Sequence, residues 1–158
     1  MSNRNWKAYV LWVLLVEAVG VLAALVTGEG TAWFTENAVK PPLTPPSIVF
    51  PIVWTVLYGL MGVSAARIWQ MPDSQDRSRS LNLFIIQLIL NFFWTLIFFN
   101  ARAYGVASIW IVILWIAVLL MILQFRKTDM LAAWLQIPYL IWLTLAAYLT
   151  FGVWLLNG

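Results

Sequence analysis

The chain has 158 residues, of which 63% are hydrophobic and 9% charged, and its formal net charge is +3. An average soluble domain carries roughly 25% charged residues, so this composition excludes a water-soluble fold and predicts an integral membrane protein. Cysteine and histidine are absent, which excludes disulfide bonds, zinc chemistry and Cys or Ser–His nucleophilic catalysis. We therefore expect no metal, no cofactor and no conventional catalytic residue.

Five apolar windows each have the length of about twenty residues that a helix needs to cross a bilayer. No alternation of period two runs through them, so helices are expected rather than the strands of a barrel. The predicted fold is an all-α bundle of five transmembrane helices that forms one domain over residues 1–158. Its spans are expected at about 8–27, 47–69, 81–100, 104–123 and 130–156.

The first span carries two features that apolar helices usually lack. Glu17 lies near its middle, where a carboxyl group is either a proton or ligand site or a neutral group that bonds a neighbouring helix. Gly20, Ala24 and Gly28 recur every four residues. Such a stripe of small residues predicts close helix packing, either within one chain or between two copies.

A long loop is expected between the first two spans. It ends in KPPLTPPSIVFPIVW, Lys40 to Trp54, which holds five of the seven prolines. Proline fixes φ and pushes the residue before it out of helical geometry, so the loop should reach the second span in a restricted shape. Pro51 then lies in the first turn of a helix that begins near Ile48, where a missing N–H costs least.

The second and third spans each present a face of aromatic and polar side chains. On the second span, Trp54 and Tyr58 share a face with small or flexible residues. On the third, the spacing i, i+4, i+7, i+11 brings two amides and two aromatics together, at Gln87, Asn91, Trp94 and Phe98. Amides on such a face either bond neighbouring helices or orient a ligand, and both readings remain open.

The fifth span offers a similar face with Tyr139, Trp142 and Ala146, next to Pro138. A proline inside a helix removes one hydrogen bond, so a kink is expected there. Three helices with aromatic faces predict a cavity for a large, flat, apolar ligand, with a few polar groups to orient it.

Basic residues are distributed unequally between the two ends of the predicted bundle. Seven lie on the N-terminal side and two on the other, at Lys40 and Arg102. The positive-inside rule then predicts a cytoplasmic N-terminus, with the first loop and the C-terminus outside, in an inner or plasma membrane. The net charge follows from this topology, and no nucleic-acid partner is expected.

Three ordered runs together resemble the TspO family, the tryptophan-rich sensory proteins whose mitochondrial members are called translocator protein or peripheral benzodiazepine receptor. The runs are KPPLTPPSIVFPIVWTVLYGLMGVSAARIW, QLILNFFWTLIFFNAR and IPYLIWLTLAAYLTFGVW. The resemblance covers essentially the whole chain. It implies a dimeric five-helix bundle that binds porphyrins such as protoporphyrin IX, and in many members benzodiazepine-site ligands and sterols, in a pocket toward the first loop.

The resemblance also assigns residues. The positions that match the family's loop and pocket motifs are Trp33, Lys40, Pro41, Pro45, Pro46, Trp54, Asn91, Trp94, Trp142 and Ala146. With their neighbours on the same helix faces, the expected ligand-binding residues are Trp33, Lys40, Trp54, Tyr58, Gln87, Asn91, Trp94, Phe98, Tyr139, Trp142 and Ala146.

Two functions follow from the resemblance, a tetrapyrrole-binding receptor, regulator or carrier and an enzyme-like, light-dependent breakdown of porphyrin. Trp54 and Trp142 match the tryptophans linked to that breakdown in some bacterial relatives. A protein that serves only packing or assembly is a third, less favoured reading. Tyr148 is followed by no basic residue, so the animal-type sterol motif is missing.

Overall fold

The computed structural model describes residues 5–158, and within this range it is helical, with no strand. The helices are α1 (Trp6–Val26), α2 (Gly28–Asn37), α3 (Val49–Trp69), α4 (Gln75–Thr95), the π-helix η1 (Leu96–Asn100), α5 (Tyr104–Phe125), α6 (Met130–Leu135) and α7 (Ile137–Asn157). Five segments of this range are long and apolar enough to cross a membrane, namely Trp6–Val26, Val49–Trp69, Gln75–Asn100, Tyr104–Phe125 and Met130–Asn157. The predicted all-α bundle of five spans is therefore confirmed.

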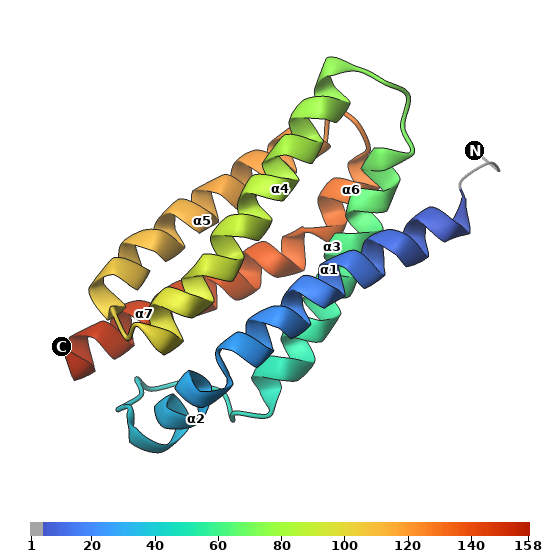
Figure 1. Ribbon diagram of the computed structural model, residues 1–158. Helices are drawn as coiled ribbons and strands as arrows, with labels where there is room; N and C mark the ends of the chain where they lie inside the picture. Colours follow the sequence, from blue (N-terminus) through green and yellow to red (C-terminus); the bar gives the residue numbers. More distant parts are fainter. Residues whose placement is uncertain (1–4) are drawn as a thin grey trace.

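The helices run roughly parallel or antiparallel along one bundle axis (Figure 1). α1 packs against α3, α4 against α5, and α5 against α7. The start of α1 and the C-terminus lie at opposite ends of the bundle, as an odd number of spans requires (Figure 1). α2 lies across the end where α1 finishes, and α6 lies near the other end, beside α3 (Figure 1).

Helix α1 lies on the outside of the bundle. Only Val16 and Ala23 of its 21 residues are buried, while large side chains such as Leu14, Leu22 and Leu25 are more than half exposed. A helix with so many exposed apolar side chains is unfavourable in water, whereas lipid can surround it. The bundle core is instead centred on α5, with Ile111, Leu114, Val118, Met121 and Phe125 all at 1% exposure or less.

Two boundaries near the ends of the bundle differ from the sequence-based expectation. The first loop is not all loop, because residues Gly28–Asn37 form α2. The third span begins at Gln75 rather than near residue 81, since the Ser74 side chain caps the helix by accepting from the Arg77 N–H. The polar residues after Ser74 thus form a first helical turn, although their composition resembles that of a loop.

The fifth span was expected to be one helix with a kink, but it consists of two helices, α6 and α7. α6 ends at Leu135, and α7 begins at Ile137 with Pro138 at its second position. A proline at the start of a helix loses no hydrogen bond that the helix could have made. The short helix α6 is therefore free to turn toward α3.

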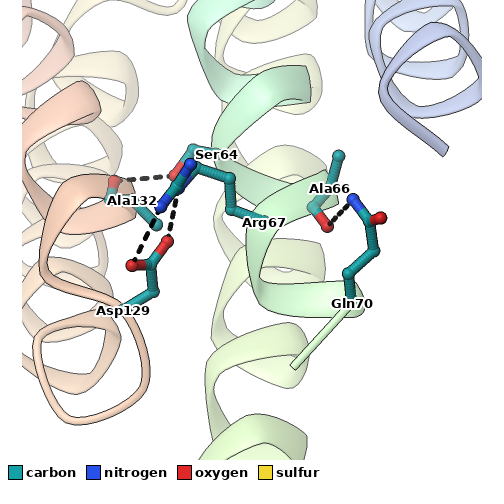
Figure 2. Close-up of polar contacts among 6 residues, drawn as sticks. All are labelled: Ser64, Ala66, Arg67, Gln70, Asp129 and Ala132. Carbon is teal, nitrogen blue, oxygen red and sulfur yellow. Dashed lines mark hydrogen bonds and ion pairs between the residues drawn. The ribbon is translucent and has the colours of Figure 1, made fainter. Parts of the chain in front are cut away.

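Polar contacts hold α6 against α3 (Figure 2). The buried Ser64 hydroxyl donates to the Ala132 carbonyl at 2.7 Å, and the Arg67 guanidinium pairs with both carboxylate oxygens of Asp129, which precedes α6. Figure 2 shows Ser64 and Arg67 reaching from the same side of α3 toward this segment. These bonds fix the end of the bundle that lies opposite α2.

The proline-rich loop between α2 and α3 is fastened to α7. The Asn157 side chain accepts from the Val39 N–H at 2.9 Å and donates to the Val39 carbonyl at 2.8 Å. The Tyr148 hydroxyl donates to the Pro42 carbonyl at 2.7 Å. Pro41 lies so close to Gly152 that a Cβ there would come within 2.7 Å of its ring. The loop is thus attached to the bundle at three successive turns of α7.

Candidate functional site

A cavity of about 760 Å³ lies inside the bundle, under the proline-rich loop. Its walls come from α1, α2, α3, α4, η1 and α7. The volume is in the range of pockets that enclose small molecules and cofactors, about 300–1,000 Å³. We call it the aromatic pocket, because Phe34, Phe50, Trp54, Tyr58, Trp94, Phe98, Phe99 and Trp142 all line it.

The rings of the aromatic pocket form two connected groups. On one side Trp54 lies 5.4 Å from Tyr58 at a 30° interplanar angle, and 6.4 Å from Trp142 at 88°. On the other side Trp94 stacks on Phe98, with centroids 5.1 Å apart and an angle of 24°. Such contacts hold each ring in a fixed orientation, so the walls are preformed flat surfaces.

The loop and the end of α2 close the pocket from above. Phe34, Lys40, Pro41, Pro45 and Pro46 line it. The Lys40 ammonium donates to the Thr35 and Ala38 carbonyls, at 3.0 Å each, and lies 5.1 Å from the Phe34 ring centre. A cation is therefore held at the rim of an otherwise apolar cavity.

Small residues of α1 make room for the pocket. Gly20 and Ala24, two members of the predicted stripe, line it, and a Cβ on Gly20 would come within 2.6 Å of the Tyr58 ring. At this position the stripe serves packing within one chain. Gly28, its third member, has nothing within 4 Å of an added Cβ.

Four buried polar side chains form a hydrogen-bonded chain across three helices, next to the pocket. The Tyr58 hydroxyl of α3 donates to the Asn91 Oδ1 of α4 at 3.0 Å. The Asn91 Nδ2 donates to the Tyr139 hydroxyl of α7 at 2.7 Å, and that hydroxyl donates to the Gln87 Oε1 at 2.8 Å. We call these residues the amide network. In this arrangement the amides of Gln87 and Asn91 form hydrogen bonds with side chains of neighbouring helices. This was one of the two roles considered for them, the other being to orient a ligand.

Seven of the eleven expected ligand-binding residues line the aromatic pocket, and four do not. The seven are Lys40, Trp54, Tyr58, Trp94, Phe98, Trp142 and Ala146. Gln87, Asn91 and Tyr139 lie behind the wall in the amide network, with only Tyr58 both in the network and at the cavity. The fourth is Trp33.

Trp33 is not among the residues that line the aromatic pocket. It packs against Arg102, whose guanidinium lies 3.7 Å from the centre of its ring. The neighbouring Phe34 lines the pocket instead. In a helix, successive side chains point about 100° apart. Because this segment is α2 rather than an irregular loop, only one of the two adjacent aromatics can face the cavity.

Several lining residues had no signal in the sequence strong enough to single them out. Phe50 lies 5.6 Å from Trp142 and completes the wall on the α3 side. Thr150 and Val153 of α7 follow Ala146 at helical spacing, so extending that face by two turns would have found them. Phe34 could have been found by treating residues 28–37 as helical.

Two indole N–H groups in the pocket wall lack hydrogen-bond partners in the described part of the chain. They belong to Trp94 and Trp142, and both nitrogens are shielded from solvent. Buried donors usually find an acceptor. Among the described residues, neither indole N–H donates a hydrogen bond.

Glu17 does not line the aromatic pocket. Its Oε2 lies 3.4 Å from where a Cβ on Gly59 would stand, so the side chain faces α3. Within residues 5–158 its carboxyl group has no hydrogen bond or ion pair. The same range contains no cluster of three or more acidic side chains that could hold a metal ion.

Fold and site together define a class, a multi-pass helical membrane protein with a preformed aromatic pocket roofed by a proline-rich loop. The family model described as the TspO/MBR family matches residues 12–155. The chain therefore belongs to the TspO/MBR family, as its sequence motifs had suggested.

Individual relatives are similar over most of their length. The tryptophan-rich protein TspO of Chlorobaculum tepidum is 33% identical, with 98% of this chain and 99% of the relative covered. Protein CrtK of Rhodobacter capsulatus is 35% identical over 80% of this chain and 79% of its own length. The translocator protein of Ovis aries is 32% identical, with coverage of 94% and 89%.

Proposed function

We propose that this protein is a membrane receptor or carrier that binds a metal-free porphyrin, such as protoporphyrin IX, in the aromatic pocket. The observation that carries the proposal is the pocket itself, about 760 Å³ in volume and walled by fixed aromatic rings. Flat conjugated ligands stack on such rings. The names of the relatives, translocator protein and tryptophan-rich sensory protein, agree with a receptor or carrier role.

The polar groups of the pocket suit a porphyrin that has no iron. Haem iron usually needs a His or Cys axial ligand, and this chain has neither. The Lys40 ammonium lies at the rim, where it would attract the propionates and orient the ring.

A titration in the dark tests this function. Protoporphyrin IX is added to the purified full-length chain, and quenching of tryptophan fluorescence is followed to saturation. Trp142→Ala removes a wall ring and should weaken binding about tenfold or more, as loss of a ring that stacks on a base weakens nucleic-acid complexes by about 1–3 kcal/mol. Trp6→Ala is the matched control, because Trp6 is 68% exposed at the far end of α1. Absence of saturable quenching in the unmodified chain would refute the proposal.

A second function is favoured by the pairing of Trp54 with Trp142. Their rings lie 6.4 Å apart on the same wall, so both could donate an electron to a light-excited porphyrin bound against that wall. The excited porphyrin and oxygen would supply the chemistry, and the protein would supply the pocket and the donors.

Illumination separates the two functions. If the protein only binds, the porphyrin absorbance stays constant in light when corrected for free porphyrin. If it degrades the ligand, absorbance falls, and Trp54→Phe and Trp142→Phe abolish the fall while the Trp6→Phe control does not. Phenylalanine keeps an aromatic surface but is a poor electron donor, so binding in the dark should survive in these variants.

We also propose that benzodiazepine-site ligands and sterols compete for the same pocket, and that the chain forms a homodimer. The apolar lining supports the first part. The exposed small and apolar residues of α1 offer a lipid-facing surface on which two copies could pack. Displacement of protoporphyrin IX by each ligand class and chemical cross-linking in membranes are the corresponding measurements.

A further inference from the structure

A second cavity, of about 480 Å³, lies on the outside of the bundle, where α1 passes into α2. Leu25, Val26 and Phe99 form its apolar part, and Glu29, Asn100 and Arg102 form its polar part. Phe99 also lines the aromatic pocket and so stands between the two cavities. We call this second cavity the charged cleft.

The charged cleft lies level with the ends of two membrane-spanning segments. It is bordered by Val26 and Asn100, the last residues of two neighbouring membrane-spanning segments. Trp33, which packs on Arg102, is of the residue type that concentrates at this boundary. The polar side of the cleft thus belongs to the headgroup region and its apolar side to the acyl chains.

The shape of the charged cleft is fixed by close packing. A Cβ on Gly30 would come within 2.6 Å of the Phe99 carbonyl oxygen, so only glycine lets α2 approach η1 this closely. The Asn100 Nδ2 donates to the Val26 carbonyl at 3.1 Å and ties η1 to the end of α1. A π-helix such as η1 is rare and is found often at functional sites.

The position of Arg102 is also constrained. Its φ of +53° lies in the left-handed region, which is uncommon for residues other than glycine. Its guanidinium is stacked 3.7 Å from the centre of the Trp33 ring, an arrangement that leaves the N–H groups at the edge of the guanidinium plane free to donate. Backbone and side chain together hold this cation at the cleft.

Two opposite charges line the charged cleft without pairing. Glu29 and Arg102 both contribute to its wall, yet within residues 5–158 neither side chain has a hydrogen bond or an ion pair. Opposite charges held apart around one cavity are complementary to a ligand that itself carries both charges. The apolar residues beside them are complementary to a hydrocarbon chain.

We propose that the charged cleft binds a zwitterionic phospholipid whose headgroup is phosphoethanolamine. Arg102 donates to the phosphate, the anion that guanidinium groups recognise best. Glu29 accepts hydrogen bonds from the primary ammonium, and the first methylenes of an acyl chain lie on Leu25, Val26 and Phe99. Phosphatidylglycerol lacks the ammonium, and phosphatidylcholine has an ammonium that cannot donate hydrogen bonds, so both should bind less well.

Native mass spectrometry of the detergent-purified full-length chain tests this site. The protein is equilibrated with an equimolar mixture of phosphatidylethanolamine and phosphatidylglycerol that have identical acyl chains. We expect one phosphatidylethanolamine to be retained with a preference of about tenfold or more, since a hydrogen bond to a charged group contributes about 1.5–3 kcal/mol and 1.4 kcal/mol corresponds to a factor of ten. Equal retention of the two lipids would overturn the proposal.

Charge variants locate the site. Glu29→Gln should abolish the preference between the two lipids, whereas Glu36→Gln, the same change on the same helix but outside the cleft, should keep it. Arg102→Gln should reduce retention of both lipids, because both carry the phosphate. A preference that is unchanged in Glu29→Gln, or retention that is unchanged in Arg102→Gln, would contradict the assignment.

A third arm distinguishes the lipid from its soluble headgroup. Glycerophosphoethanolamine, which has the same charged groups and no acyl chains, is added at the concentration of the lipid. Continued retention of the lipid supports the lipid assignment, and displacement would contradict it in favour of a soluble zwitterion. All variants should bind protoporphyrin IX in the dark like the unmodified chain, so this inference and the porphyrin proposal can fail independently.

Discussion

At the scale of single residues, Asn91 links three helices and contacts a residue that lines the aromatic pocket. Its side chain accepts from Tyr58 and donates to Tyr139, so both ends of the amide are used within the protein. Tyr58 in turn lines the aromatic pocket and lies in contact with Trp54. A hydrogen bond outside the cavity therefore helps to orient one ring of the pocket wall.

Asn91→Ala should destabilise the protein by about 1–3 kcal/mol, because it leaves buried hydroxyl groups on Tyr58 and Tyr139 without their partner. Thermal unfolding in detergent measures this. Asn37→Ala is the control, since Asn37 is exposed and bonds only within its own helix. Equal unfolding temperatures for the two variants would show that the amide network does not contribute to stability.

Gly20 and Gly28 provide a matched pair at the same scale. Gly20→Ala places a methyl group 2.6 Å from the Tyr58 ring, and such overpacking costs about 1–3 kcal/mol. It should lower the unfolding temperature and weaken protoporphyrin IX binding, because Tyr58 must move into the pocket. Gly28→Ala, with open space around the new methyl group, should change neither quantity. A Gly20→Ala variant that behaves like Gly28→Ala would contradict the close approach of α1 to α3.

At the scale of elements, the loop between α2 and α3 is bonded to and packed against α7. Asn157 forms both hydrogen bonds with the Val39 backbone, and Pro41 is seated on Gly152. A long connecting segment is usually mobile, but this one is restricted by its prolines and attached at several points. The roof of the aromatic pocket is thereby held in one position over the rings.

Asn157→Ala should release the loop from the last turn of α7. We expect faster amide hydrogen exchange at Val39 and faster dissociation of protoporphyrin IX, with little change in the bundle core, because only the roof loses bonds. Hydrogen exchange read by mass spectrometry and stopped-flow fluorescence check the two effects. Leu156→Ala, next to it and 48% exposed, is the control and should leave both rates unchanged.

At the scale of the whole molecule, the orientation in the membrane remains a prediction from charge. The structure confirms that α1 begins and the chain finishes at opposite ends of the bundle (Figure 1). The basic residues at the end that carries α6 and the α3–α4 connection outnumber those at the end that carries α2. The α6 end should therefore be cytoplasmic, which places both cavities toward the outer side.

Cysteine labelling tests this orientation without background, because the chain contains no cysteine. A membrane-impermeant maleimide applied to whole cells should label Thr35→Cys, in the exposed part of α2, and should not label Ser78→Cys, on the opposite side, until the cells are lysed. The reverse pattern would invert the topology and would move the charged cleft to the cytoplasmic leaflet.

The sequence alone determined the membrane class, the number of spans and the aromatic faces of three helices, because these depend on apolar length and on helical spacing along one segment. It did not show that Trp33, Gln87, Asn91 and Tyr139 lie outside the lining of the aromatic pocket. Whether residues 28–37 coil as a helix, and whether Asn91 meets a tyrosine or a ligand, depends on segments far away in the chain.

Only the tertiary structure decided which buried polar groups form hydrogen bonds with other side chains and which do not. It bonded Gln87, Asn91 and Tyr139 to one another and left the indole N–H groups of Trp94 and Trp142 without partners among the described residues. It also brought Glu29 and Arg102, from distant parts of the chain, to one cleft. Hydrogen-bond partners and cavity walls are set by packing between helices, and the periodicity of a single helix does not specify its neighbours.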